Sequence, residues 1–175
     1  RQMCIRDSYL GLETLDTIDD TLKMSNLTWQ DVDINHLDLC DKSVYQDVYK
    51  TGNTIGIFQM ESLEGRRMCA EAETDNIEDI IVVNAANRPG TKDSFPVYCK
   101  NKLHPEQAVV LHDDLKSIFA KTQYILLYQE QALAMFRYAG FPETEVDNAR
   151  RAIGKKKADV MAALGEKFKV GLANK

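Results

Sequence analysis

Apolar residues recur at helical spacing along most of the chain. The first such stripe is separated by steps of three, three and four residues and consists of Leu12, Leu15, Ile18 and Leu22. Aspartates fall between these positions, which is typical of an amphipathic surface helix. A second helix is expected after Asp41, a favourable N-cap residue, and should end near Gly52.

The central part of the chain mixes apolar runs with prolines. Residues 54–60 could form a short strand or a buried entry into a helix over 61–73, and periodicity alone leaves both open. A largely buried helix is expected over 76–87, ended by Arg88-Pro89-Gly90, because a residue before proline avoids the helical region. Its expected buried residues are Ile77, Ile80, Ile81, Val83 and Ala86. Residues 91–111, with Pro96 and Pro105, are predicted to be rich in loops.

The C-terminal third reads as a succession of helices. A short one is expected over 113–120, and a longer one over 129–139 closed by Gly140. Pro142 marks the start of the next, which runs to Gly154, and the last should span 158–173. The pattern therefore predicts a mainly α fold with at most a few short strands.

Composition supports a globular chain with a real core. Of its 175 residues, 44% are hydrophobic and 28% charged, near the average for soluble domains. No apolar run approaches the length of a membrane span, and residues 1–8 are too short and too charged for a signal peptide. The four cysteines are far apart and form no C-x-x-C pair, so buried free thiols are expected rather than a zinc site or disulfides.

Charge is distributed unevenly along the chain. The formal net charge is −5, but residues 1–149 contain 14 basic and 25 acidic side chains, and residues 150–175 contain eight basic and two acidic ones. An acidic protein is repelled by nucleic acid at long range. Any contact with phosphate must therefore come from a local basic surface, and the C-terminal stretch is the candidate.

The densest cationic cluster runs from Arg150 to Lys157 around Gly154. Guanidinium groups suit pairs of phosphate oxygens, and lysines add mobile point charges. Two interpretations stay open: a site for polyphosphate or a nucleic-acid backbone, and a solvated helix end whose cations complement the helix dipole. The first requires that Arg150 and Arg151 face a concave surface; ion pairs with neighbouring acids would count against it.

Other candidate chemistry is weaker. The chain lacks a Walker loop and a G-x-S-x-G elbow. The histidines stand isolated in polar surroundings and are interpreted as surface residues; they are His36, His104 and His112. The acid pairs at 19–20 and 113–114 are better explained by solvation and helix capping than by metal binding.

Two short segments allow either a structural or a binding role. The turn at Arg88-Pro89-Gly90, followed by Lys92, could hold a strand of nucleic acid or a triphosphate, or Arg88 could neutralise Glu78 or Asp79. Residues 128–131 (Tyr-Gln-Glu-Gln) look like packing followed by polar residues at a helix start, although such side chains also contact sugars and bases.

Five motifs in order resemble those of one family. The resemblance covers residues 9–175 and is to the bacterial replicative DNA polymerase III alpha subunits, C-family polymerases of the shorter, non-PolC form. Each motif is weak alone, and together they are specific. The motifs are Tyr9-Leu10-Gly11-Leu12, Gly56-Ile57-Phe58-Gln59-Met60-Glu61-Ser62, Arg88-Pro89-Gly90 with Asp93-Ser94, Tyr128-Gln129-Glu130-Gln131, and Arg150 to Lys157.

The resemblance implies a function for the cationic cluster. The matching stretch of the family runs from the end of the palm through the helical fingers, which close over the incoming deoxynucleoside triphosphate. Arg150 and Arg151 are then expected to meet the triphosphate, with Lys155 and Lys156 nearby and Arg88 lining the same cleft. Template–primer DNA and the triphosphates are the expected partners. A sliding clamp and other replisome proteins would bind elsewhere on the parent protein.

The resemblance also places the catalytic chemistry outside this chain. Palm aspartates would hold two Mg²⁺ ions, and the third of these aspartates should stand where this sequence has Ser8. We therefore expect residues 1–8 to be a non-native leader, 9–45 a palm-to-fingers connection and 46–175 the fingers. The parent would be a cytoplasmic DNA-directed DNA polymerase, bacterial or encoded by a phage, and the fragment alone inactive. The alternative is a small helical protein-interaction module with a solvated basic C-terminal helix.

Overall fold

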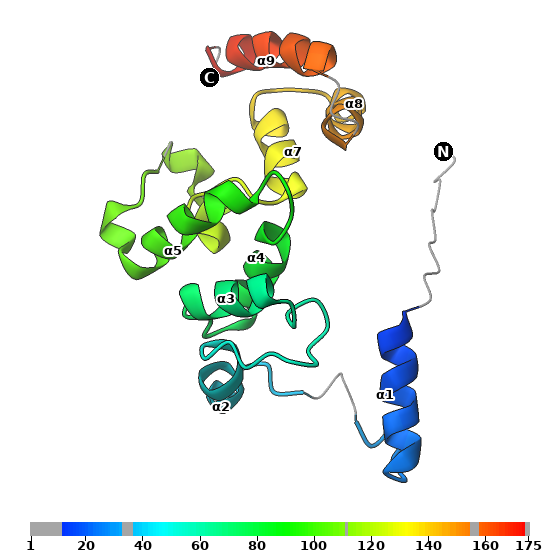
Figure 1. The fold of residues 1–175 in the computed structure, drawn as a ribbon. Helices are drawn as coiled ribbons and strands as arrows, with labels where there is room; N and C mark the ends of the chain where they lie inside the picture. The colour runs from blue at the N-terminus through cyan, green and yellow to red at the C-terminus, as the bar shows by residue number, and fades with distance from the viewer. Residues whose placement is uncertain (1–11, 33–36, 111, 155–157, 174–175) are drawn as a thin grey trace. The chain divides into compact units, whose positions relative to one another are not determined.

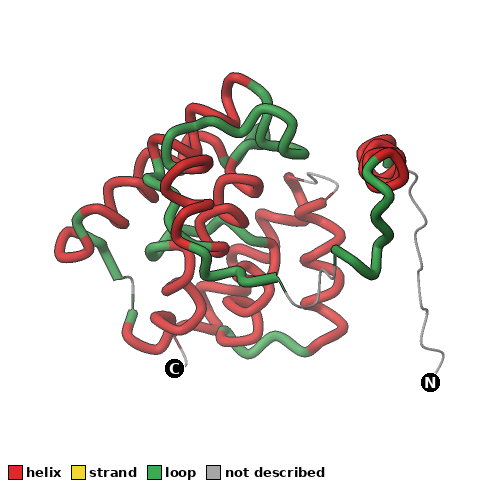
Figure 2. The backbone as a smooth tube through the Cα atoms, turned by 90° about the horizontal axis from the view of Figure 1, so that it is seen from below, coloured by secondary structure: helices red, strands yellow, loops and turns green. Residues whose placement is uncertain are grey.

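The computed structural model describes residues 12–32, 37–110, 112–154 and 158–173. Every regular element in these ranges is helical, which confirms the predicted mainly α fold (Figures 1 and 2). The chain divides into two units, the first ending at Asp41 and the second beginning at Lys42. The longer helices are α1 (Glu13–Met24), α3 (Leu63–Glu71), α4 (Ile77–Ala86), α5 (Phe95–Leu103), α7 (Gln129–Tyr138), α8 (Glu143–Gly154) and α9 (Ala158–Ala173).

The first unit contains the predicted amphipathic helix, α1. Its stripe is mostly exposed: Leu15 keeps about half of its surface and only Leu22 is buried. A turn follows, in which the Trp29 indole donates to Asp19 at 2.9 Å. This hydrogen bond ties the turn back to the helix.

The second unit begins with the predicted second helix. It starts as α2 (Lys42–Val44), widens into a π-helical turn at Tyr45–Tyr49 and gives way to a turn at Gly52, where φ is +70°. The segment 54–60, left open above, forms turns rather than a strand. Gly56 and Gln59 both have positive φ, which extended strands exclude. The Thr54 hydroxyl closes the segment by donating to the Met60 carbonyl at 2.6 Å.

Helix α4 crosses the larger core of this unit. It has the predicted bounds, because the Asn76 side chain caps its start and Asn87 follows its end. The expected burial of Ile77 and Ile81 is wrong, since their exposed fractions are 37% and 45%. The buried stripe repeats at steps of three, one and three instead, and consists of Asp79, Val82, Val83 and Ala86. Val83 and Ala86 are buried as predicted, and the rest of the stripe is not evident from the sequence because it starts at a charged residue.

The prediction of loops over residues 91–111 is wrong for residues 95–103, which form α5. A 3₁₀ turn at Lys92–Ser94 leads directly into α5, in which Phe95, Tyr98 and Cys99 are buried. Pro96 lies in the first turn of the helix, where its missing N–H has no partner to lose. The proline therefore starts a helix here instead of preventing one.

Three short helical pieces precede α7. Asp113–Leu115 and Ala120–Thr122 are 3₁₀ turns on either side of α6 (Lys116–Phe119), which confirms the short helix predicted here. The acids at 113 and 114 lie at its start, as expected from the helix dipole. Leu115 and Phe119 are buried and hold the segment in place.

Helices α7, α8 and α9 share a smaller core at the C-terminal end of the unit, where Figure 1 draws them in yellow to red. Gly140 ends α7 with φ +85° and Pro142 precedes α8, as predicted. At Gly171, a Cβ atom would lie 2.2 Å from the Ala139 carbonyl oxygen, so α9 approaches the end of α7 closely only because this residue is glycine. None of the described helices is long and apolar enough to cross a membrane.

Candidate functional site: the cationic end of helix α8

The predicted arginines lie on the C-terminal half of α8. Ala149 and Ala152 are buried and define the inner face of this part of the helix, and Ala149 belongs to the smaller core. Arg150 and Arg151 therefore lie on its outer face. Their side chains keep 49% and 64% of their surface. Across the interface with α7, the Gln129 amide donates to the backbone carbonyl of Arg150 at 3.4 Å.

Both guanidinium groups share one carboxylate. Arg150 donates to one oxygen of Asp147 at 3.0 and 2.9 Å, and Arg151 lies 2.7 Å from the other oxygen. The hydrogen bond from Arg150 is the main influence on Asp147 and lowers its pKa. Two positive charges and one negative charge leave this group, which we call the α8 triad, with a net charge of +1.

The pairing counts against a preformed phosphate site. Among the described residues, Arg150 and Arg151 line neither the apolar cavity between α7 and α9 nor the cavity between α3 and the start of α5, and both pair with an acid on their own helix. The ion pairs are exposed, however, and exposed pairs on one helix are weak. A more highly charged anion can therefore displace Asp147. Lys155 and Lys156, predicted to lie nearby, are outside the described residues.

Arg88 lies in an exposed turn. Its backbone carbonyl accepts from the Thr91 and Lys92 amides at 3.3 Å, while Gly90 adopts φ +102°. Pairing of Arg88 with Glu78 or Asp79, one of the two alternatives, is wrong, because those acids pair with Lys121 and Lys102. In the described residues, no hydrogen bond or ion pair joins Arg88 to α8, and a cleft shared by Arg88 and the α8 arginines stays a prediction.

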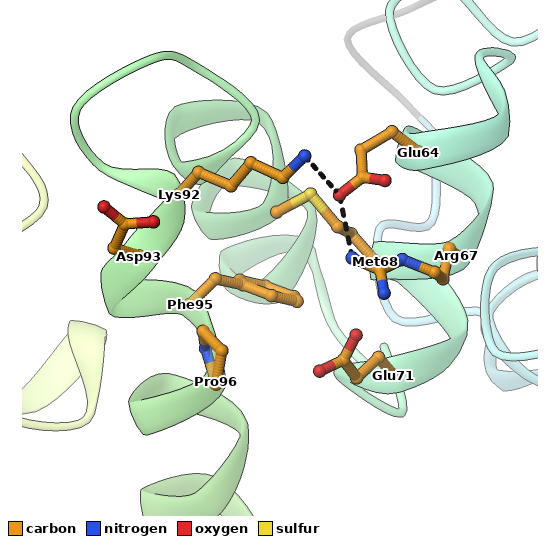
Figure 3. Close-up of a pocket in the computed structure, with 8 residues that line it drawn as sticks. All are labelled: Glu64, Arg67, Met68, Glu71, Lys92, Asp93, Phe95 and Pro96. Atoms are coloured by element: carbon orange, nitrogen blue, oxygen red, sulfur yellow. Dashed lines mark hydrogen bonds and ion pairs between the residues drawn. The ribbon is translucent and has the colours of Figure 1, made fainter.

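Close to this turn, a cavity of about 290 Å³ opens between α3 and the start of α5 (Figure 3). Its floor is apolar and its rim is charged. Glu64 forms ion pairs with both Arg67 and Lys92, whose nitrogens each lie 2.9 Å from its Oε1 atom. The lining residues are Glu64, Arg67, Met68, Glu71, Lys92, Asp93, Phe95 and Pro96. The sequence pattern does not predict this site, since residues about 25 positions apart form it.

A buried ionic network, also missed, ties α3, α4 and α5 together. Asp79 is 2% exposed and accepts hydrogen bonds from the Tyr98 hydroxyl at 2.5 Å and the Lys102 ammonium at 2.7 Å. Lys102 also donates to the carbonyls of Ala72 and Glu73, at 3.0 and 2.9 Å, and so caps the C-terminus of α3. Burial is the largest of the effects that raise the pKa of Tyr98, followed by its bond to Asp79. The network is structural rather than open to a ligand.

The segment 128–131 also has a structural role at Gln131. This buried side chain accepts from the amides of Leu127 and Tyr128, both at 2.9 Å, and donates to the Ile118 carbonyl and the Thr122 hydroxyl. Its hydrogen bonds anchor the start of α7 to the preceding turns. For Gln131 the packing alternative is therefore the correct one.

Tyr98 and Tyr128 both have buried hydroxyl groups near Asp79, so their replacement by phenylalanine tests how much each hydroxyl contributes to stability. Within the described part of the chain, the Tyr128 hydroxyl is buried without a hydrogen-bond partner, and burial raises the pKa of Tyr128 to about 12. Tyr98→Phe should lower the free energy of unfolding by about 1.5–3 kcal/mol, because Asp79 loses a charge-assisted bond. Tyr128→Phe should leave it unchanged or raise it by about 1 kcal/mol. Urea unfolding measures both, and an equal loss for the two variants would contradict the assignment.

The remaining candidate ligands are dispersed. His104 and His112 are exposed, as predicted, and His36 lies outside the described residues. Cys69 and Cys99 are buried free thiols, and burial raises the pKa of Cys69 to about 11 and that of Cys99 to about 12. Cys40 is free but exposed, contrary to expectation. No three His, Cys, Asp or Glu side chains in the described ranges gather into a metal site.

Comparison with known proteins identifies the protein class to which this helical chain belongs. Residues 14–175 match the family model described as the bacterial DNA polymerase III alpha subunit finger domain. The match extends from the second residue of α1 to the end of the chain. It therefore covers α1 except for its first residue, and the other six longer helices completely. The class is therefore that of polymerase finger domains.

Individual relatives support the same assignment. The DNA polymerase III alpha subunit of Xylella fastidiosa (strain Temecula1) is 35% identical over 175 residues, 97% of this chain and 15% of the relative. Those of Helicobacter pylori (strain J99) and Halalkalibacterium halodurans are 36% and 33% identical, over 97% and 95% of this chain. The chain belongs to the bacterial DNA polymerase III alpha subunit family, and it spans about 15% of the length of these relatives.

Proposed function

We propose that this chain binds the triphosphate of an incoming deoxynucleotide through Arg150 and Arg151, as the fingers of a DNA-directed DNA polymerase. The observation that carries the proposal is the α8 triad: two adjacent exposed guanidinium groups in a polymerase finger domain, both paired with one exposed carboxylate. Lys155, Lys156 and Arg88 would add positive charge around the phosphates. Positioning and charge neutralisation are what phosphoryl transfer asks of a protein.

Binding on this model is an exchange of anions. A triphosphate offers several oxygens and a charge near −4, whereas Asp147 offers two oxygens and a charge of −1. Arginine forks bind phosphate oxygens in pairs, so both side chains can leave Asp147 without losing charge-assisted hydrogen bonds. The cleft around the nucleotide would be completed by other parts of the polymerase, because the chain spans only about 15% of its relatives.

The parent activity is part of the proposal. A cytoplasmic polymerase containing this chain would extend template–primer DNA with Mg²⁺ held by palm aspartates outside this chain. Contacts with a sliding clamp and other replisome proteins would likewise lie outside this chain. The chain alone would bind nucleotide without catalysing synthesis.

The rival function is a helical interaction module in which the α8 triad is a solvated helix end. The pairing of both arginines with Asp147 is the observation that favours it. On that account Asp147 is a stabilising partner, and removing its charge brings no gain in binding. On the proposed function Asp147 is a competitor of the phosphates.

Removing this competitor tests the proposal. Asp147→Asn should tighten binding of dATP to the chain by about threefold or more, because the net charge of the triad rises from +1 to +2. Glu143→Gln is the matched control. It removes another carboxylate of α8 that is paired with an arginine, Arg137 of α7, and should change affinity little. Equilibrium titration at low salt measures both. Affinity that stays constant or falls in Asp147→Asn would refute the exchange.

A further inference from the structure

The cavity between α3 and α5 carries an inference that is independent of nucleotide binding. It is walled by α3 on one side and by the turn into α5 on the other (Figure 3). Its volume of about 290 Å³ lies at the lower edge of the range for small-molecule sites. This space suits a single long side chain rather than a whole nucleotide.

The charges around the cavity do not balance. Three acids face two cations, and both cations, Arg67 and Lys92, are engaged by the same acid, Glu64. The hydrogen bond from Lys92 is the largest influence on Glu64 and lowers its pKa, and Arg67 adds to the effect. In the described part of the chain, Glu71 and Asp93 have no ion pair. The cavity thus has a net charge of −1 and two carboxylates available to a ligand.

These carboxylates lie on different walls. Glu71 extends from α3 toward Phe95 and Pro96, and Asp93 belongs to the turn before α5 (Figure 3). Glu71 influences Arg67 only through a weaker, longer-range attraction than that of Glu64. An incoming anion would meet both free acids, whereas an incoming cation would be attracted by them.

The floor of the cavity narrows the choice of cation. Met68 and Phe95 are buried at 0% and 3% exposure, and with Pro96 they present an apolar surface. An aliphatic stem can pack on this surface while its charged head meets the carboxylates. Guanidinium is planar, weakly hydrated and able to donate in several directions at once, which matches two acids on opposite walls better than a compact ammonium does.

We infer that this cavity binds an arginine side chain presented by a partner protein segment. The arginine stem packs on Met68, Phe95 and Pro96, and its guanidinium donates to Glu71 and Asp93. Such a contact makes the face formed by α3 and α5 a protein-docking surface, separate from the α8 triad. The binding energy comes from the charge-assisted hydrogen bonds and from packing of the aliphatic stem on the apolar floor, and the electrostatic part weakens as salt is added.

A peptide titration tests this inference on the whole chain. The probes are acetyl-Gly-Gly-Arg-Gly-Gly-amide and its citrulline counterpart, which has nearly the same shape without the charge, followed by amide NMR shifts. The arginine peptide should shift the amides of Glu71 and Phe95 with an affinity in the millimolar range, about tenfold or more tighter than the citrulline peptide. The double variant Glu71→Gln, Asp93→Asn should abolish the difference between the peptides. Glu106→Gln, which removes one negative charge from an exposed side chain that does not line the cavity, should preserve it.

Three outcomes would overturn the inference. Equal binding of the two peptides would mean that only the apolar floor is recognised. Tighter binding of inorganic tripolyphosphate at the same amides would assign the cavity to anions. No shift at Glu71 or Phe95 with about 10 mM arginine peptide would leave the cavity without this ligand. None of these results bears on dATP binding by α8, so the two proposals can fail separately.

Discussion

Replacing Lys102 with methionine should lower the free energy of unfolding of this chain by about 3–5 kcal/mol, because Asp79 would remain buried without its cation. The two side chains are only 13% and 4% exposed, and the substitution also removes the hydrogen bonds to the Ala72 and Glu73 carbonyls, which directly follow α3. Urea unfolding followed by circular dichroism measures the loss.

A neighbouring ion pair provides the matched control. Lys121 pairs with Glu78 one residue before Asp79, but its side chain is 70% exposed. Lys121→Met should therefore change stability little, since water replaces the lost partner. The double variant Asp79→Leu, Lys102→Met should recover part of the loss, because no uncompensated charge remains. Similar losses for Lys102→Met and Lys121→Met would mean that the buried network contributes nothing special.

Removal of both arginines from the α8 triad should weaken dATP binding by about a hundredfold. Each contributes charge-assisted hydrogen bonds to phosphate, whose loss corresponds to about tenfold in affinity. The variants are Arg150→Ala and Arg151→Ala, alone and combined, measured by equilibrium titration. In a polymerase that contains this chain, the same double variant should raise the KM for deoxynucleotides in primer extension.

Arg137→Ala is the control for loss of an exposed, paired arginine. Arg137 pairs with Glu143 at 2.7 Å, much as Arg150 pairs with Asp147. It should leave dATP affinity close to that of the parent chain. Wild-type affinity in the double variant would exclude Arg150 and Arg151 as the triphosphate site and favour the interaction-module alternative.

Local signals were enough to predict most helices. Asn76 and Asn87 bound α4 at the expected places, and Gly140 and Pro142 separate α7 from α8, because caps and breakers act within a few residues. Pro96 was misread for the same local reason: a proline ends one helix and starts another equally well, and only packing of Phe95 and Tyr98 decides between them. Likewise, the burial of Asp79 depends on Lys102, which is 23 residues away.

The candidate site was predicted in position but not in its pairing. A cationic end of α8 was expected, and Arg150 and Arg151 do lie together on it. Asp147 is three and four residues before them, so their common ion pair follows from helix geometry and could have been anticipated. The cavity at Glu71 and Asp93 could not, because it depends on how α3 and α5 approach each other. The relation of Arg88 to α8 is likewise set by tertiary arrangement.

The second unit has two separate cores, and the cations of α8 lie on a helix that packs on the smaller one. The Asp79 network and the anchoring bonds of Gln131 both lie outside the smaller core formed by Phe136, Phe141, Val146 and their neighbours. A rigid rotation of α8 and α9 about the second half of α7 would therefore repack this small set of side chains and break the Gln129–Arg150 hydrogen bond, while the larger core stays intact. The close contact between Gly171 of α9 and the Ala139 carbonyl is the point at which this rotation has the least room.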